Sequence, residues 1–274
     1  MLKTKISLDT ELLQWPKIDA HSHTWLKGGK LNTQELESIL EDCQILGIKK
    51  ICISIPFTGI ASKCKGPDVI SSANDVVIKA IGKYPGKVLG YAFIHPGYHE
   101  WAQKEMQRCL AVDGMIGIKL YHQYFFNDPV VVSIVASAAQ KNALILLHQG
   151  KVTDDRSKKT EPLISDGFHI AELAKQVPAA KIICGHILGG GDWEWTTKAL
   201  KDSPSVYIDT SGSVIDDGAV EFVAEQIGTD RMLFATDLSI EEGVGKILGA
   251  NISKDAKKAI FYGNFNNLLK KVDK

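Results

Sequence analysis

The sequence predicts an α/β protein, and more closely a single-domain (β/α)8 TIM barrel that spans residues 1–274. Three observations support this fold class. Eight short runs of apolar and β-branched residues occur along the chain, and segments with helical periodicity lie between them. Most of the runs are almost continuously apolar, which is typical of parallel strands covered on both faces. Eight strand–helix units within about 250 residues are what a barrel of this type requires.

The expected elements alternate in order along the chain. Strands are predicted at 17–23, 49–57, 87–96, 114–122, 143–150, 181–187, 205–212 and 231–239. Helices are predicted at 32–46, 68–86, 98–110, 130–142, 168–178, 194–204, 219–228 and 255–271. Asn32 and Glu35 form a capping-box-like start for the first helix, and Gly47 marks its end. Neither a GxGxxG nor a GxxxxGK[ST] motif occurs, which disfavours a nucleotide-binding open sheet.

Composition limits the partners of the chain. The 274 residues include 32 basic and 32 acidic side chains, so the formal net charge is zero. A strongly charged partner such as nucleic acid or an anionic membrane is therefore not expected, and a small molecule is. Five scattered cysteines without a CxxC pair, together with the lack of a signal-peptide core, predict reduced thiols and a cytoplasmic location. A homodimer is the default expectation for the oligomeric state.

The first predicted strand carries two histidines one residue apart. Side chains alternate along a strand, so His21 and His23 point the same way. At the carboxyl end of the first barrel strand this direction is the mouth of the barrel, where two imidazoles can share one metal ion. An isolated HxH is weak support for such a site, because two packed or solvated histidines produce the same pattern.

Three further polar residues strengthen the metal hypothesis. His148, His186 and Asp237 each follow an apolar run and precede a loop. In a closed barrel the eighth strand lies beside the first, which brings Asp237 next to the paired histidines. Three nitrogen ligands and one carboxylate, with a position left open for water, are the ligand set of a catalytic divalent metal; zinc is the most frequent one, and iron, manganese or cobalt are alternatives.

These motifs together resemble the amidohydrolase superfamily, and in particular the branch called amidohydrolase 2. The carriers are DAHSH, GIKLYH, LLHQG, CGHILGG, VYIDTSG, MLFATDLS and IFYGNFNNLL, in this order. The resemblance implies one metal ion at the C-terminal mouth, held by His21, His23, His148 and Asp237. It also implies that His186 lies beside the metal-bound water. Members of the branch include hydrolases, lactonases and aromatic-acid decarboxylases.

The expected chemistry assigns two catalytic residues. A bound divalent ion lowers the pKa of its water to about 7 and polarises a carbonyl or carboxylate. Asp237 touches both metal and water, so it accepts a proton and returns it to the leaving group. His186 orients the water or shares its proton, or alternatively ligates a second metal. One metal ion, most simply Zn²⁺, is the preferred interpretation.

Lys119 keeps the two-metal alternative open. Some members of the superfamily bridge two metals with a carboxylated lysine on the fourth strand, and Lys119 in GIKLYH stands at that strand end. The residue is otherwise a cation that binds a substrate carboxylate, or a structural partner of an acid. Two further residues are substrate-binding candidates: His122, three residues beyond Lys119, and Arg156 in the charged connector 150–167, whose guanidinium suits a carboxylate.

Three functions follow from this site. The leading prediction is a metal-dependent hydrolase that cleaves an amide, lactone or ester of a small substrate. The alternative keeps the same site and predicts non-oxidative decarboxylation of an aromatic or unsaturated acid, because the fold alone does not select a reaction. The third is a barrel that binds a metal or ligand without catalysis. Convergence of Lys119 and Arg156 on the mouth would indicate a carboxylated substrate.

Overall fold

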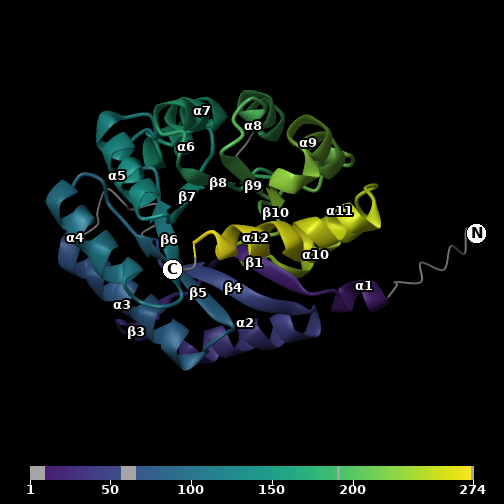
Figure 1. Cartoon of the computed structure of the whole chain (residues 1–274), viewed down its shortest axis with the longest axis horizontal. Helices are drawn as coiled ribbons and strands as arrows, with labels where there is room; N and C mark the ends of the chain where they lie inside the picture. Colours follow the sequence, from purple (N-terminus) through teal and green to yellow (C-terminus); the bar gives the residue numbers. More distant parts are fainter. Residues whose placement is uncertain (1–9, 57–65, 190–191, 273–274) are drawn as a thin grey trace, which may run out of the picture.

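Eight parallel strands form the centre of the protein in the computed structural model, which describes residues 10–56, 66–189 and 192–272. Their order in the sheet follows their order in the chain (Figure 1). The strands are β1 (Lys17–His23), β4 (Ile48–Ser54), β5 (Val88–Phe93), β6 (Met115–Leu120), β7 (Leu144–His148), β8 (Lys181–Gly185), β9 (Val206–Asp209) and β10 (Met232–Leu233). This sequential parallel order is that of a (β/α)8 barrel, as predicted.

The barrel is nearly closed between its last and first strands. Strand β10 has only two residues and pairs with β9. Beyond it, two backbone hydrogen bonds join this segment to β1: Ala20 donates to the carbonyl of Phe234 at 2.9 Å, and Asp237 donates to the carbonyl of His21 at 2.9 Å. The second bond sets the backbone of Asp237 directly beside that of His21.

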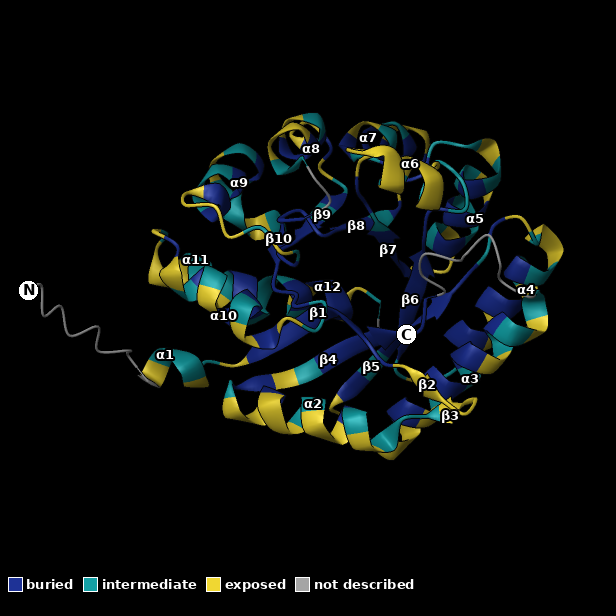
Figure 2. Ribbon diagram, turned by 180° about the vertical axis from the view of Figure 1, so that it is seen from behind, coloured by how far each residue is buried: buried dark blue, intermediate teal, exposed yellow. Residues whose placement is uncertain are grey.

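Helices cover the outside of the sheet, and their exposed residues face away from it (Figure 2). They are α2 (Thr33–Ile45), α3 (Pro67–Lys83), α4 (His99–Leu110), α5 (Pro129–Gln140), α7 (Gly167–Gln176), α8 (Trp193–Leu200), α9 (Ala219–Ile227) and α10 (Ile240–Gly249). The predicted capping box of the first helix is wrong in detail. Asn32 makes no side-chain bond to the helix backbone and instead donates to the Glu35 carboxylate at 3.0 Å.

The apolar core has two parts. One lies between the strands and the outer helices, and the other fills the inside of the barrel. The inner part includes Ile18, Tyr91 and Leu146, and it is covered at one end by Phe265 and Leu268 of α12 (Asn264–Lys270), which follows α11 (Lys254–Lys258) and η3 (Ala259–Gly263). Helix α12 thus covers the N-terminal end of the inner core.

Two additions shape the open end. A short hairpin of β2 (Leu26–Lys27) and β3 (Lys30–Leu31) follows β1. The connector 150–167, predicted as a long loop, contains helix α6 (Asp155–Thr160). An isolated bridge between Gln149 and Ser165 holds its two ends together. The remaining short elements are α1 (Thr10–Gln14) and η2 (Thr229–Arg231).

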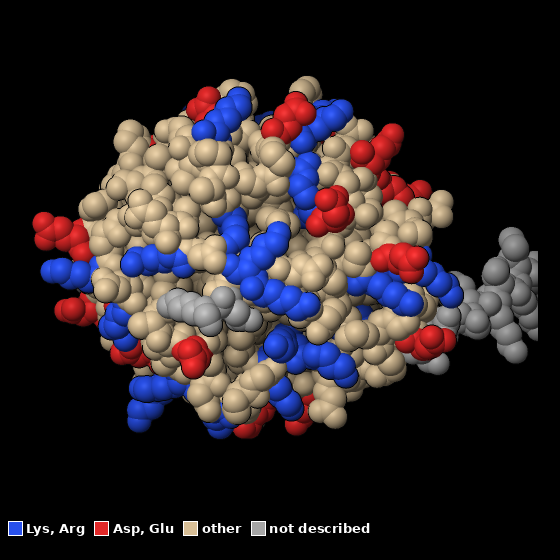
Figure 3. Space-filling model, viewed as in Figure 1, with Lys and Arg blue, Asp and Glu red and all other residues tan. Residues whose placement is uncertain are grey.

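The surface charge is uneven although the net charge is zero. The face that carries α12 shows Lys and Arg side chains near its centre (Figure 3). A hollow at this end is lined by Lys50, Lys141 and Lys270, with Asp113 as its acidic residue. Among the helices of the described ranges, none is both long and apolar enough to cross a bilayer.

Candidate metal centre

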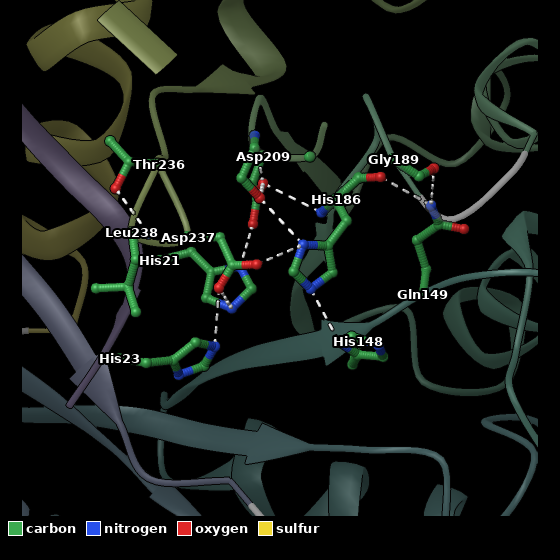
Figure 4. A network of polar contacts seen from close by, with 12 residues as sticks. His21, His23, His148, Gln149, His186, Gly189, Asp209, Thr236, Asp237 and Leu238 are labelled. Carbon is green, nitrogen blue, oxygen red and sulfur yellow. Dashed lines mark hydrogen bonds and ion pairs between the residues drawn. The ribbon is translucent and has the colours of Figure 1, made fainter. Parts of the chain in front are cut away.

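Residues from the first and last strands meet at the open end of the barrel. His21 and His23 are both buried, and their ring centroids are 5.0 Å apart. The Oδ1 atom of Asp237 lies 3.0 Å from Nε2 of His23 and 3.9 Å from Nε2 of His21 (Figure 4). The structure therefore brings together three of the four predicted metal ligands, although more than 200 residues separate Asp237 from the two histidines in sequence.

The three side chains fit a divalent metal ion. One donor atom from each lies within 4.8 Å of the others, and ligands about 2.0–2.2 Å from a common ion are separated by roughly 3–4 Å. Burial raises the pKa of Asp237, but the hydrogen bond with His23 and the neighbouring His21 and His186 rings outweigh it and hold this pKa well below its usual range. Burial also lowers the pKa of His23 to about 4. The group thus offers an ionised carboxylate and a neutral imidazole at neutral pH.

His148 and His186 form a second pair beside this group. Nδ1 of His148, at the end of β7, lies 2.9 Å from Nε2 of His186, and Nδ1 of His186 lies 3.3 Å from Oδ2 of Asp237. The His148 ring stacks on Tyr121 with centroids 3.9 Å apart. His186 therefore connects His148 to Asp237, and the ligand role of His148 stays a prediction because its donor atoms lie outside the group of three.

Protein partners hold the Nδ1 atoms of the histidines on β1. Nδ1 of His21 lies 2.7 Å from Oδ2 of Asp209, and Nδ1 of His23 lies 3.1 Å from Oγ of Ser54. Such contacts orient the rings and leave Nε2 as the nitrogen for a metal. Asp209, the acidic residue of the VYIDTSG motif, thus contacts a predicted ligand directly.

Asp209 is the centre of a buried hydrogen-bond network at the end of β9. Its Oδ1 atom accepts from the backbone amide of His186 at 3.2 Å and from the amide and hydroxyl of Ser211 at 2.9 and 2.6 Å. Burial raises the pKa of Asp209, but His21, together with His186 and Ser211, lowers it to about 2. The ionised carboxylate fixes the His21 ring and the backbone of His186 at the same time.

Asp19 is a site-supporting residue that sequence reasoning missed. Its carboxylate accepts from the amide of His21 at 3.1 Å and from the amide and hydroxyl of Thr236 at 3.0 and 2.6 Å. It thereby links the strand that carries the histidines to the segment that carries Asp237. Its spacing was the available signal, because a residue two positions before His21 on a strand faces the same side.

Backbone strain is concentrated at the two predicted catalytic residues. His186 has φ 62°, and Asp237 and Leu238 have φ 47° and 74°. Residues other than glycine seldom adopt this left-handed conformation, and it occurs often at functional sites. The side chains of His186 and Asp237 point toward one another (Figure 4).

Lys119 lies beside His21 in the candidate metal centre and does not line the cavity at the barrel mouth. It is fully buried on β6, and its Nζ atom is 2.9 Å from Nε2 of His21. Burial lowers the pKa of Lys119 to about 8, although Asp237 opposes this shift. The amine therefore approaches the same nitrogen that a metal would use.

The other predicted substrate-binding residues lie in different places. A cavity of about 390 Å³ opens at the mouth and is lined by His148, His186, Asp237 and Glu161, among others. His122 is buried, with Nε2 4.0 Å from the Glu161 carboxylate. Arg156 is exposed on α6 and does not line the cavity, so the convergence with Lys119 that would have indicated a carboxylated substrate is not seen. Lys151 lines the cavity instead and pairs with Asp192 at 2.5 Å.

Comparison with known proteins identifies relatives of the chain. A family model described as amidohydrolase matches residues 18–267. A curated protein, the gamma-resorcylate decarboxylase of Polaromonas sp. strain JS666, is 24% identical over 276 residues, which cover 82% of this chain and 84% of that protein.

Solved structures show the same fold. The 2,6-dihydroxybenzoate decarboxylase from Rhizobium has a TM-score of 0.74 at 17% identity and covers 93% of this chain and 99% of its own. The dihydroxybenzoic acid decarboxylase from Polaromonas sp. JS666, with bound manganese and the inhibitor 2-nitroresorcinol, has a TM-score of 0.68 at 19% identity and covers 94% and 98% of the two chains.

These comparisons correct the predicted reaction and the predicted identity of the metal ion. The leading prediction of a hydrolase is wrong, because the relatives are decarboxylases, in agreement with the alternative. A divalent metal is supported, but zinc is not, since one of these proteins holds manganese. The family model covers most of the chain, including every predicted metal-site residue, and the chain therefore belongs to the amidohydrolase family of enzymes.

Proposed function

We propose that the protein catalyses metal-dependent, non-oxidative decarboxylation of a small aromatic carboxylic acid. The observation that carries this proposal is the contact of His186 with Asp237 in a cavity beside the paired histidines of β1. The decarboxylases among the relatives support it. The reaction converts an acid and a proton into carbon dioxide and the ring compound, so the site must bind a carboxylate and supply a proton at carbon.

The metal ligands in this proposal are His21, His23 and Asp237, with His148 as the fourth. Manganese is the proposed ion, because a related decarboxylase holds it. When bound, a divalent ion acts as a Lewis acid toward the substrate carboxylate and fixes its orientation. Asp209 and Ser54 contact Nδ1 of the two histidine rings and so orient them for an ion at Nε2.

The proton is handled by His186 and Asp237. Burial lowers the pKa of His186 to about 3, so the ring is neutral at neutral pH and carries one exchangeable proton. Its Nδ1 atom faces Oδ2 of Asp237 at 3.3 Å, and the Asp237 side chain is 30% exposed toward the cavity whereas His186 is 9% exposed. We assign to this pair the relay of a proton from solvent to the ring carbon: the pair takes up one proton from water in the cavity, delivers it to that carbon as the bond to the carboxylate breaks, and returns to a neutral imidazole and an ionised carboxylate.

The test is carbon dioxide release from a panel of aromatic acids by the manganese-loaded protein. Hydroxybenzoates and aminobenzoates form the panel, and His186→Asn and Asp237→Asn are the variants. We expect release from at least one acid and a loss of about 100-fold or more in kcat for either variant, because a positioned acid–base group contributes about 10²–10⁴-fold. Absence of release from every acid, with the metal bound in full, would overturn the proposal.

A further inference from the structure

The N-terminal end of the barrel, opposite the candidate metal centre, has a hollow of its own. Its volume is about 370 Å³, close to the 390 Å³ of the cavity at the mouth. The lining comes from the starts of β4 and β5, the turn before β6, the segment between α5 and β7, and α12 with the residues after it. Sites for small molecules commonly have volumes of about 300–1,000 Å³, so this hollow is large enough to hold a ligand.

The floor of the hollow is apolar. Ile116 and Leu269 line it and belong to the inner core of the barrel, and they are only 6% and 8% exposed. Leu89 of β5 also lines the hollow and packs against the same core. An apolar part of a ligand in this hollow therefore contacts the inner core and leaves water.

Lysines supply the charge around this floor. Lys50, Lys141 and Lys270 line the hollow together with one acidic residue, Asp113. Within the described ranges none of these three lysines takes part in an ion pair, whereas Lys83 on α3 pairs with a glutamate at 3.2 Å. The hollow therefore carries positive charge that acidic side chains do not neutralise.

Two further lysines lie beside the end of α12. Lys181, at the start of β8, contacts the side chain of Asn142 and donates to the carbonyl of Lys271 at 3.2 Å. Asn142 follows Lys141 in the chain and donates to the same carbonyl. Burial lowers the pKa of Lys181, and the charge of Lys271 lowers it further. The positive charges on this face are therefore close enough to repel one another (Figure 3).

Helix ends explain only part of this charge. Lysines near a helix C-terminus interact favourably with the helix dipole, and Lys141 and Lys270 have such positions on α5 and α12. Lys50 and Lys181 instead belong to strands. The whole chain has 32 basic and 32 acidic side chains, so the excess of lysines at this end is a local feature and does not reflect the composition.

The side chains at the rim favour a phosphate group. A lysine ammonium is a compact point charge that commonly binds phosphate, whereas the planar fork of arginine matches a carboxylate better. Among the described residues, no arginine lines the hollow. A phosphate monoester carries a charge of about −1.5 to −2 at pH 7, which suits several ammonium groups around one apolar floor.

We propose that this hollow binds a phosphate monoester of a small apolar molecule, with the phosphate held by Lys50, Lys141 and Lys270. The apolar body of the ligand lies on Ile116 and Leu269. This inference is independent of the proposed decarboxylation, because it concerns a second site at the other end of the barrel. The ligand also contacts α12, which covers the inner core, so its binding stabilises the folded protein.

The test separates the charge of the ligand from its apolar body. Isothermal titration calorimetry measures binding of phenyl phosphate, inorganic phosphate and the singly charged benzenesulfonate to the manganese-loaded protein. We expect phenyl phosphate to bind about tenfold or more tightly than either of the others, and less tightly at high salt. Equal affinity for phenyl phosphate and inorganic phosphate, or no binding of phenyl phosphate, would overturn the proposal.

Variants locate the site. Lys50→Met and Lys270→Met each remove one charge from the rim, and we expect either to weaken phenyl phosphate binding about tenfold. Lys104→Met changes an exposed lysine of α4 and is the matched control, with an affinity within about twofold of wild type. Lys151→Met changes the lysine that lines the mouth and should also leave the affinity unchanged. Loss of binding in Lys151→Met alone would place the phosphate at the mouth and contradict the assignment.

Two further measurements complete the test. Phenyl phosphate should raise the Tm of the wild-type protein and have little effect on that of Lys50→Met, because only a ligand that binds the folded state stabilises it. Vesicles with anionic phosphate headgroups are the other measurement. Binding to these vesicles without binding of phenyl phosphate would show that the lysines contact a membrane surface, and the proposal would fail.

Discussion

The two sides of the barrel mouth differ in how their polar groups are satisfied. On the side formed by β1, β9 and β10, Asp19 accepts three hydrogen bonds and Asp209 contacts four donor groups. On the side formed by the ends of β6 and α6, Nε2 of His122 and the two amide atoms of Gln123 lack a hydrogen-bond partner within the described residues, and Glu161 lies 4.0 Å from that Nε2 atom. The first side is organised by hydrogen bonds within the protein, whereas the second leaves buried polar atoms unpaired.

The largest expected effect comes from removing the centre of the paired side. The double variant His21→Ala/His23→Ala loses the two proposed ligands that lie beside Asp237, so we expect metal content to fall roughly tenfold or more and turnover to vanish. Elemental analysis after dialysis and a carbon dioxide assay measure both, with circular dichroism as the folding control. A folded double variant with full activity would show that these histidines are not ligands.

The next prediction concerns Asp209, which contacts the proposed ligand His21. Asp209→Asn removes the charge that holds Nδ1 of His21, and loss of such a partner weakens metal affinity by about 10–100-fold. Competition with a chelator measures the affinity. Ser203→Ala on the same barrel, outside this network, is the control, and equal affinity in both variants would contradict the role of Asp209.

The pH dependence of stability should differ between two glutamates, one on each side of this comparison. Burial raises the pKa of Glu105 on α4, but Arg108 and Asn74 outweigh it and lower this pKa; burial raises that of Glu161. Ionised Glu105 therefore stabilises the fold at pH values above the pKa that it has in the unfolded chain, and this stabilisation is lost as the pH falls. Ionisation of Glu161 has the opposite effect and opposes folding. Glu105→Gln should lower the free energy of unfolding by about 2 kcal/mol at pH 7 and by less at pH 4.

Glu161→Gln should show the reverse trend. Because its raised pKa opposes folding once the carboxyl ionises, the variant gains stability relative to wild type as the pH rises above the pKa that the carboxyl has in the unfolded chain. Urea denaturation at several pH values measures both variants. The same sign of pH dependence for the two glutamates would contradict the distinction between paired and unpaired groups.

A smaller effect is expected from single polar groups on each side. Ser211→Ala removes a hydroxyl that donates to Asp209 at 2.6 Å and should cost about 1 kcal/mol of stability. Gln123→Met replaces an amide whose two buried polar atoms are unpaired and should be neutral or stabilising by up to about 1 kcal/mol. Thermal denaturation compares them, and a larger loss for Gln123→Met would reveal a partner for that amide.

The smallest effect is expected at Arg156. This residue is exposed on α6, so Arg156→Ala should change stability by less than about 0.5 kcal/mol and leave kcat/KM unchanged. Lys151→Met is the informative neighbour, because Lys151 lines the cavity. A large rise in KM for Arg156→Ala would restore it as a substrate-binding residue.

Local sequence determined the barrel and half of the site. The period of apolar residues depends only on neighbours in the chain, so the eight strands and the positions of His21, His23, His186 and Asp237 at strand ends could be read directly. The closing of the barrel then required Asp237 to lie beside His21, and the structure shows this.

Tertiary structure decided the rest. The contact of His148 with His186, the links made by Asp19, and the meeting of Glu161 with His122 join residues 38, 217 and 39 positions apart. No periodicity encodes such distances, because they depend on how loops pack on the finished barrel. The reaction was not readable from the predicted ligands either, since the same nitrogen and carboxylate donors serve hydrolysis and decarboxylation.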